Sequence, residues 1–172
     1  MNEQVDGLAV RRDVLIAFEY AHNEDDWVFP LADALAGITA EEGVWKPDPN
    51  DTEFRCIWRI VLHMTAWTNN IVERMAQRMR GERPGKPPAG SWPPLPASPD
   101  VAAWEDAQRL LWESLSALRA HIEATPPVVM LEQGNAGYSQ LSDLLCRLIH
   151  NAYHIGQITK MRECHAALTS GR

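Results

Sequence analysis

Residues 139–168 read SQLSDLLCRLIHNAYHIGQITKMRECHAAL, and this stretch decides the fold class. Its apolar residues recur at intervals of three and four, which is typical of an α-helix and not of a strand. Ser139 can cap the start of this helix, which should extend to about Leu168. One apolar stripe lies roughly opposite the two histidines of the stretch, so we expect it to pack on another helix or on a second subunit. The stripe consists of Leu141, Leu144, Leu148, Ala152 and Ile155.

The same spacing predicts three more long helices along the chain. The first covers residues 6–22 and continues over 27–36 after an acidic break, with a bend at Pro30. The second covers residues 52–80, and the third covers residues 98–125. Between the first two, Thr39 and Glu42 have the spacing of a capping box and predict a short helical turn.

A long connection separates the second and third helices. Residues 81–99 hold seven of the twelve prolines and three of the ten glycines, which cannot continue a helix. Ser98 is expected to cap the next helix, with Pro99 in its first position. A long connection allows the second and third helices to run in the same direction. The sequence therefore predicts an all-α four-helix bundle with up-down-down-up topology, in one domain over residues 1–172.

Two histidines in the last helix are spaced for a metal site. His150 and His154 lie four residues apart, so they project from one side of the helix, one turn apart. Two imidazoles in this arrangement can reach one metal ion. The spacing alone also fits a chance pair, a surface pair or two histidines that share a hydrogen bond.

A third histidine lies on the inner face of the second helix. His63 shares an apolar stripe with Ile60, Trp67 and Ile71. A buried histidine needs a partner, and a backbone carbonyl or a neighbouring side chain would satisfy it. Together with the histidine pair of the last helix, however, it would give three neutral ligands and leave a coordination position open on Zn²⁺, Ni²⁺ or Fe²⁺. That arrangement is typical of catalytic and not of structural sites.

The sequence also resembles a known family. The run His150-Asn-Ala-Tyr-His154-Ile-Gly-Gln157, with Leu-His63-Met-Thr-Ala-Trp67 upstream, is similar to the DinB/YfiT-like superfamily of bacterial four-helix-bundle metalloenzymes. The resemblance extends over nearly the whole chain, including the Trp-Pro-Pro loop at 92–94. It implies that a divalent metal, usually zinc or nickel, is held by His63, His150 and His154. It also implies a thiol-dependent S-transferase or isomerase that uses a bacterial low-molecular-weight thiol, although many members of the family have no assigned reaction.

Polar groups near the histidines suggest a substrate pocket. Asn70 and Arg74 follow His63 and Trp67 along the same side of the second helix, and Arg74 offers a site for a carboxylate. The two residues either line a wet pocket beside the metal or lie beyond the end of the bundle in solvent. On the last helix, Tyr153 and Gln157 flank the histidine pair and could orient a substrate or a water. Asp143 is either a partner of the metal ligands or a surface acid.

The three cysteines are not expected to bind the metal. At 1.5 Å of rise per residue, Cys56 and Cys146 lie about 10 Å and about 6 Å along their helices from His63 and His150. We expect both to be buried as small core hydrophobes. Cys164 lies near the C-terminal end.

The sequence gives little support for a di-iron site or for nucleotide-binding and serine-hydrolase motifs. Glu19 and His22 form an E-x-x-H sequence, but a di-iron bundle needs two such motifs, so we expect both residues on the surface near a helix end. No P-loop, G-x-S-x-G or dinucleotide-binding glycine motif is present.

Charge and composition narrow the class of partner. The formal net charge of −7 argues against a protein that mainly binds nucleic acid. An odd number of cysteines fits a reducing compartment, and neither a signal peptide nor a membrane span is evident, so we expect a cytoplasmic protein. Seven tryptophans and the apolar stripe of the last helix predict a homodimer.

Three functions follow from these observations. The first is a metal-dependent thiol S-transferase, hydrolase or isomerase that acts on a small electrophilic molecule, with Zn or Ni as the metal and Fe or Mn as alternatives. The second is a metal-binding or ligand-binding stress protein without turnover. The third is a purely structural helical dimer, which requires that no stoichiometric metal is bound.

Overall fold

The computed structural model describes residues 7–25, 27–52, 55–84, 92–133 and 137–170, and these ranges form an all-α protein. No strand occurs within them, and a single isolated bridge joins Gln133 to Ser139. The helices are α1 (Gly7–His22), α2 (Leu31–Leu35), α3 (Ala40–Val44), α4 (Ile57–Met79), α5 (Val101–Ala124), α6 (Pro127–Leu131) and α7 (Gln140–Ser170).

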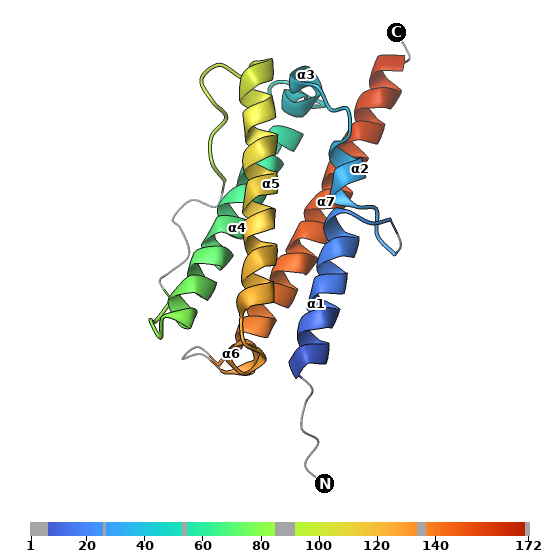
Figure 1. The fold of residues 1–172 in the computed structure, drawn as a ribbon. Coiled ribbons are helices and arrows are strands. Elements are labelled where there is room, and N and C mark those ends of the chain that lie inside the picture. The colour runs from blue at the N-terminus through green and yellow to red at the C-terminus, as the bar shows by residue number, and fades with distance from the viewer. Residues whose placement is uncertain (1–6, 26, 53–54, 85–91, 134–136, 171–172) are drawn as a thin grey trace.

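Four long helices, α1, α4, α5 and α7, pack together around one apolar core (Figure 1). Near the start of α4 and α5, the rings of Trp58 and Trp104 lie 5.1 Å apart, and both side chains are fully buried. The Trp104 indole donates a 2.7 Å hydrogen bond to the carbonyl of Ile38, which ties the segment between α2 and α3 to the core. No described helix is both long enough and apolar enough to cross a membrane.

Helix starts follow the capping chemistry only in part. Ser139 caps α7 by accepting from the backbone N–H of Ser142 at 3.1 Å, and Thr39 caps α3 by accepting from Glu42, both as predicted. The expected cap of α5 was wrong by two residues. Asp100, and not Ser98, accepts from the Ala103 N–H at 2.9 Å, because a carboxylate is a strong acceptor at a helix start.

Two predicted helices begin later than the apolar spacing indicated. The predicted helix over 27–36 is reduced to α2, which begins after Pro30, because a proline disfavours helical geometry in the residue before it. The predicted start at residue 52 moves to Ile57. Before it, Asp48 accepts hydrogen bonds from the N–H groups of Asn50 and Asp51, which hold this segment in a turn.

A short helix was missed between α5 and α7. The predicted helices end at residue 125 and resume at residue 139, but α6 begins at Pro127, a residue that suits the first turn because its missing N–H is not needed there.

The apolar stripe of α7 is covered within the chain. Leu144, Leu148 and Ile155 are buried, and α7 packs against α1, α2, α4 and α6. The first of the two expected partners, another helix of the same chain, therefore accounts for the stripe.

Candidate metal centre

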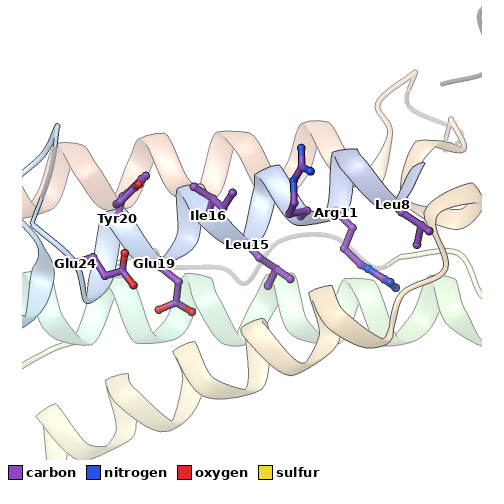
Figure 2. Close-up of a pocket in the computed structure, with 8 residues that line it drawn as sticks. Leu8, Arg11, Leu15, Ile16, Glu19, Tyr20 and Glu24 are labelled. Atoms are coloured by element: carbon purple, nitrogen blue, oxygen red, sulfur yellow. The ribbon is translucent and has the colours of Figure 1, made fainter. Parts of the chain in front are cut away.

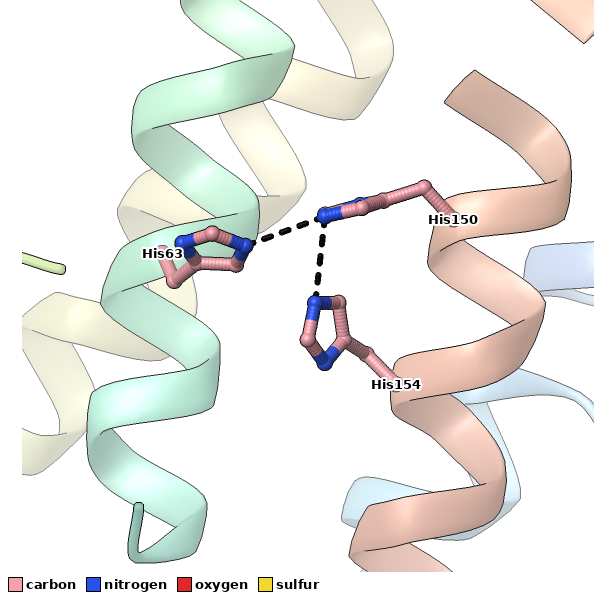
Figure 3. Close-up of side chains that lie close together, drawn as sticks. All are labelled: His63, His150 and His154. Atoms are coloured by element: carbon pink, nitrogen blue, oxygen red, sulfur yellow. Dashed lines mark hydrogen bonds between the residues drawn. The ribbon is translucent and has the colours of Figure 1, made fainter. Parts of the chain in front are cut away.

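Three histidines from α4 and α7 converge inside the bundle. His63 projects from α4, and His150 and His154 project from successive turns of α7 (Figure 3). The Nε2 atom of His150 lies 3.0 Å from that of His63 and 3.1 Å from that of His154. The potential ligand atoms of the three side chains all lie within 4.8 Å of one another. Among the described residues, these three histidines form the group of side chains that could hold a metal ion.

The cluster fits a divalent ion. Two nitrogens bound tetrahedrally to zinc at about 2.0–2.1 Å lie about 3.3 Å apart, so the two separations from Nε2 of His150 need to grow by only a few tenths of an ångström. Three neutral imidazoles supply no negative charge and leave one tetrahedral position open. His63 and His154 are almost fully buried, which shields the cluster from water.

The ring of His154 is held in the form that binds a metal. Its Nδ1 donates a 2.7 Å hydrogen bond to the side-chain carbonyl oxygen of Gln157, so Nε2 carries a free lone pair. The Gln157 amide in turn donates to the Tyr153 hydroxyl at 2.9 Å. Gln157 and Tyr153 thus support a candidate ligand and lie outside the neighbouring pocket described below.

Trp92 forms a wall of the cluster that we did not anticipate as a site residue. Its indole stacks on the His63 ring, with centroids 3.9 Å apart and planes 11° apart. The guanidinium of Arg55 lies 5.3 Å above the same indole, and Arg59 donates to the Trp92 carbonyl at 3.3 Å. The Trp-Pro-Pro motif can be recognised in the sequence, but no sequence feature predicts that Trp92 contacts His63.

Burial keeps the histidines of α7 neutral. Burial, followed by the charge of Arg147, lowers the pKa of His150 to about 3. Burial lowers the pKa of His154 to about 4, against the opposing effect of its hydrogen bond to Gln157. Neutral imidazole is the form that binds metal ions, so metal binding needs no net loss of a proton from either ring at pH 7.

A pocket of about 400 Å³ opens beside the cluster. It contains three of the residues expected to line a pocket, Trp67, Asn70 and Arg74. Asp143 also lines it and accepts from Arg74 at 3.3 Å and from Arg78 at 3.1 Å, so this acid is engaged in ion pairs. The complete lining is His63, Trp67, Asn70, Ile71, Arg74, Asp143, Cys146, Arg147 and His150.

Arg147 also lines this pocket, and the sequence did not single it out as a site residue. Its Nη1 lies 2.8 Å from Nδ1 of His150, and its Cζ lies 5.2 Å above the Trp67 ring. Burial lowers the pKa of this guanidinium to about 10. Its position three residues before His150 places it on the same side of α7, which was the available clue.

The cysteines stay outside the cluster, as expected. Cys56 is buried, and burial raises the pKa of its thiol, as befits an inert core residue. The expectation that Cys146 is buried was wrong, because α7 turns this residue toward the open pocket, where it is exposed.

The expectation that His22 lies on the surface was also wrong. His22 is fully buried, donates from Nδ1 to the Phe18 carbonyl at 2.7 Å and accepts at Nε2 from Asn151 at 3.0 Å. Burial lowers its pKa to about 4. Glu19 is partly exposed and pairs with Arg119 at 2.7 Å, so the E-x-x-H residues serve the packing of α1.

A second pocket, of about 450 Å³, runs along α1 (Figure 2). Leu8, Leu15 and Ile16 contribute apolar side chains to its lining, and Arg11 and Glu19 contribute charged ones. No histidine or cysteine is among its lining residues, so the metal-binding chemistry belongs to the pocket between α4 and α7.

No family model, curated protein or solved structure matches this chain. The resemblance to the DinB/YfiT-like superfamily therefore stays a prediction that depends on the motif residues themselves.

Proposed function

We propose that this protein is a metal-dependent enzyme that binds one divalent ion through His63, His150 and His154. The observation that carries the proposal is the convergence of three Nε2 atoms, two of them at 3.0 and 3.1 Å from the third, in a buried site beside a pocket. Zinc or nickel suits a set of three imidazoles, and iron or manganese are alternatives.

A divalent ion with an open position supplies Lewis acidity that makes a thiolate or hydroxide available near neutral pH. The chain's own residues prepare the site for this chemistry. Gln157 orients His154, and the Trp92 indole holds the ring of His63 in place. Trp67 and Ile71 offer apolar contact to a substrate in the pocket, while Asn70 and Arg74 offer polar contact.

The proposed reaction is the attack of a low-molecular-weight thiol, or of water, on an electrophilic carbon of a small molecule. This assigns the protein to the thiol S-transferases or to the related hydrolases and isomerases, as the DinB/YfiT resemblance implies. The exposed pocket supports an enzyme over a metal-binding protein without turnover, because storage of an ion requires no adjoining space for a substrate.

The test begins with metal analysis of protein purified without a histidine tag. We expect about one zinc or nickel ion per chain, and loss of free thiol when a small epoxide and a thiol are added together. A protein that holds its metal but consumes no thiol, and hydrolyses no epoxide, would favour the function without turnover. A protein without stoichiometric metal would leave only the structural role.

We also propose a homodimer, on a surface different from the expected stripe. Leu145 and Ile149 are exposed on α7, and Trp27, Val28 and Phe29 are exposed in the segment before α2. Val28 and Phe29 line a shallow pocket with Gly156, where a side chain would meet open space. Exposed large apolar groups of this kind are typical of interfaces.

The up-down-down-up order is likewise proposed for the bundle. It is supported by the contact between Trp58 and Trp104, which brings the beginnings of α4 and α5 together. The long connection over residues 81–99 has room to return the chain along the bundle.

A further inference from the structure

Arg147 is a largely buried cation without a carboxylate partner among the described residues. Its Nη1 contacts Nδ1 of His150, its Cζ lies 5.2 Å over the Trp67 ring, and its buried Nε has no hydrogen-bond partner among the described residues. The acid that lines the same pocket, Asp143, is already shared by Arg74 and Arg78. The pocket therefore carries more positive than negative charge, in a chain whose net charge is −7.

The contact between Arg147 and His150 decides where the imidazole proton lies. A guanidinium can only donate, so Nδ1 of His150 accepts, and the one proton of the neutral ring is on Nε2. Nε2 is the atom that faces His63 and His154. In this state His150 is not ready to bind a metal, whereas Gln157 leaves Nε2 of His154 free.

Binding of an ion by His150 would reverse this arrangement. With Nε2 bound to the ion, the ring proton must lie on Nδ1, where it would point at an N–H of Arg147. Two donors cannot share a hydrogen bond, and the added positive charge of the ion also repels the guanidinium. Arg147 must then leave His150, and the pocket that it lines is the adjoining space.

We propose that Arg147 is the anchor for a substrate carboxylate in this pocket, and that metal binding to His150 releases it for that role. The inference rests on the proposed metal site and names the substrate class: a small monocarboxylate with an apolar body. The planar guanidinium binds a carboxylate through two parallel hydrogen bonds, and Trp67 and Ile71 provide the apolar contact. Metal and carboxylate therefore bind cooperatively, each tightening the other by the same factor.

The test uses the full chain without a tag, first titrated with zinc and then with butyrate or butyramide, by calorimetry. Butyramide has the same shape as butyrate but no charge. We expect zinc-loaded protein to bind butyrate at least about tenfold more tightly than butyramide, and zinc-free protein to show a smaller preference. Arg147→Gln should remove the preference of the zinc-loaded protein and should bind zinc about tenfold more tightly than wild type, because its competitor for His150 is gone.

Two further variants keep the result interpretable. Arg109→Gln removes the same charge from an exposed site on α5 and should leave both affinities unchanged. Arg147→Lys keeps the charge and should retain part of the butyrate preference, which is measurable even if Arg147→Gln folds poorly.

Each outcome bears on one claim. Failure of wild-type protein to bind zinc overturns the proposed function before butyrate is added. Normal zinc binding without a preference for butyrate overturns only the carboxylate site. An undiminished preference in folded Arg147→Gln shows that the anion binds elsewhere, and weaker zinc binding in that variant shows that Arg147 supports the cluster instead of competing with the ion.

Discussion

The indole of Trp92 lies flat against the imidazole of His63, with ring centroids 3.9 Å apart. This contact joins α4 to the loop that precedes α5, and it limits rotation of a buried candidate ligand. Because His63 is the residue that α4 supplies to the cluster, the loop becomes part of the candidate metal centre.

Replacing Trp92 with Ala should therefore weaken metal binding without removing a ligand. We expect zinc affinity to fall about tenfold, the lower end of the effect of losing a residue that orients a ligand. Trp92→Phe keeps an aromatic ring and should stay within a few-fold of wild type. Equal zinc affinity in all three proteins, measured by competition with a chelator, would show that the stack has no role in binding.

The three histidines should each be required for stoichiometric metal. His63→Ala, His150→Ala and His154→Ala each leave two imidazoles, which are too few for a stable site on this chain. Metal content per folded chain should drop from about one to near zero. His121→Ala is the matched control, because the His121 ring bonds to the Ala117 carbonyl of its own helix, α5, and the substitution should leave the metal content unchanged. Full metal content in His63→Ala would contradict the proposed set of ligands.

Gln157 should tune the metal affinity through His154. Gln157→Leu removes the acceptor that holds the Nδ1 proton, and we expect zinc affinity to fall by about 10- to 100-fold. Gln157→Glu keeps an acceptor and adds negative charge, so its affinity should equal or exceed that of wild type. Tighter binding in Gln157→Leu than in wild type would run against this account.

Stability of the metal-free protein should fall in acid, and His22 should account for one share of the fall, alongside His150 and His154. Burial lowers the pKa of His22 to about 4, from 6.5 in a free side chain. A histidine with a lowered pKa stabilises the fold fully above pH 6.5, and this contribution is lost as the pH falls toward 4, since the unfolded chain takes up the proton first. The loss amounts to about 3 kcal/mol at most.

Urea unfolding between pH 7 and pH 4, with a chelator present, measures this effect. His22→Gln cannot titrate and should lose about 3 kcal/mol less than wild type over the same range. His165→Gln, at a partly exposed position near the end of α7, is the control and should follow the wild type. Parallel pH profiles for wild type and His22→Gln would exclude His22 as a source.

The protein's own thiols should be dispensable for turnover. A variant with Ala at Cys56, Cys146 and Cys164 should keep its metal and its thiol-dependent activity, apart from a loss of about 1 kcal/mol of stability at the buried Cys56. Cys146 needs a separate test because it lines the pocket. Abolished turnover in folded, metal-loaded Cys146→Ala would place the nucleophile within the chain.

Local spacing made the histidine cluster predictable from the sequence. The four-residue interval of His150 and His154, with His63 on an inward-facing stripe, contains the information that places them together. The caps at Thr39 and Ser139 were predictable for the same reason, since each depends on neighbours within three residues.

Features that depend on distant partners were not predictable. His22 looked like a residue near a helix end, but Asn151, which is 129 positions away, completes its hydrogen bonds in the core. Arg147 lies three residues before His150, which puts both on one side of α7, but the spacing does not show that its guanidinium lies over Trp67 on α4. Helical spacing in the sequence predicts the face of the helix on which a residue lies. It does not predict the position of the terminal group of a long side chain.

His63 and His150 are separated by 87 positions in the chain. During synthesis, α4 and α5 therefore exist for some time before the two α7 histidines have been made. Before α7 is made, the chain presents one of the three candidate ligands, His63, and a single imidazole cannot retain an ion against the other ligands of a cell. The candidate centre forms only when α7 docks against α4, so an ion bound there would fasten together two helices that are made far apart in time.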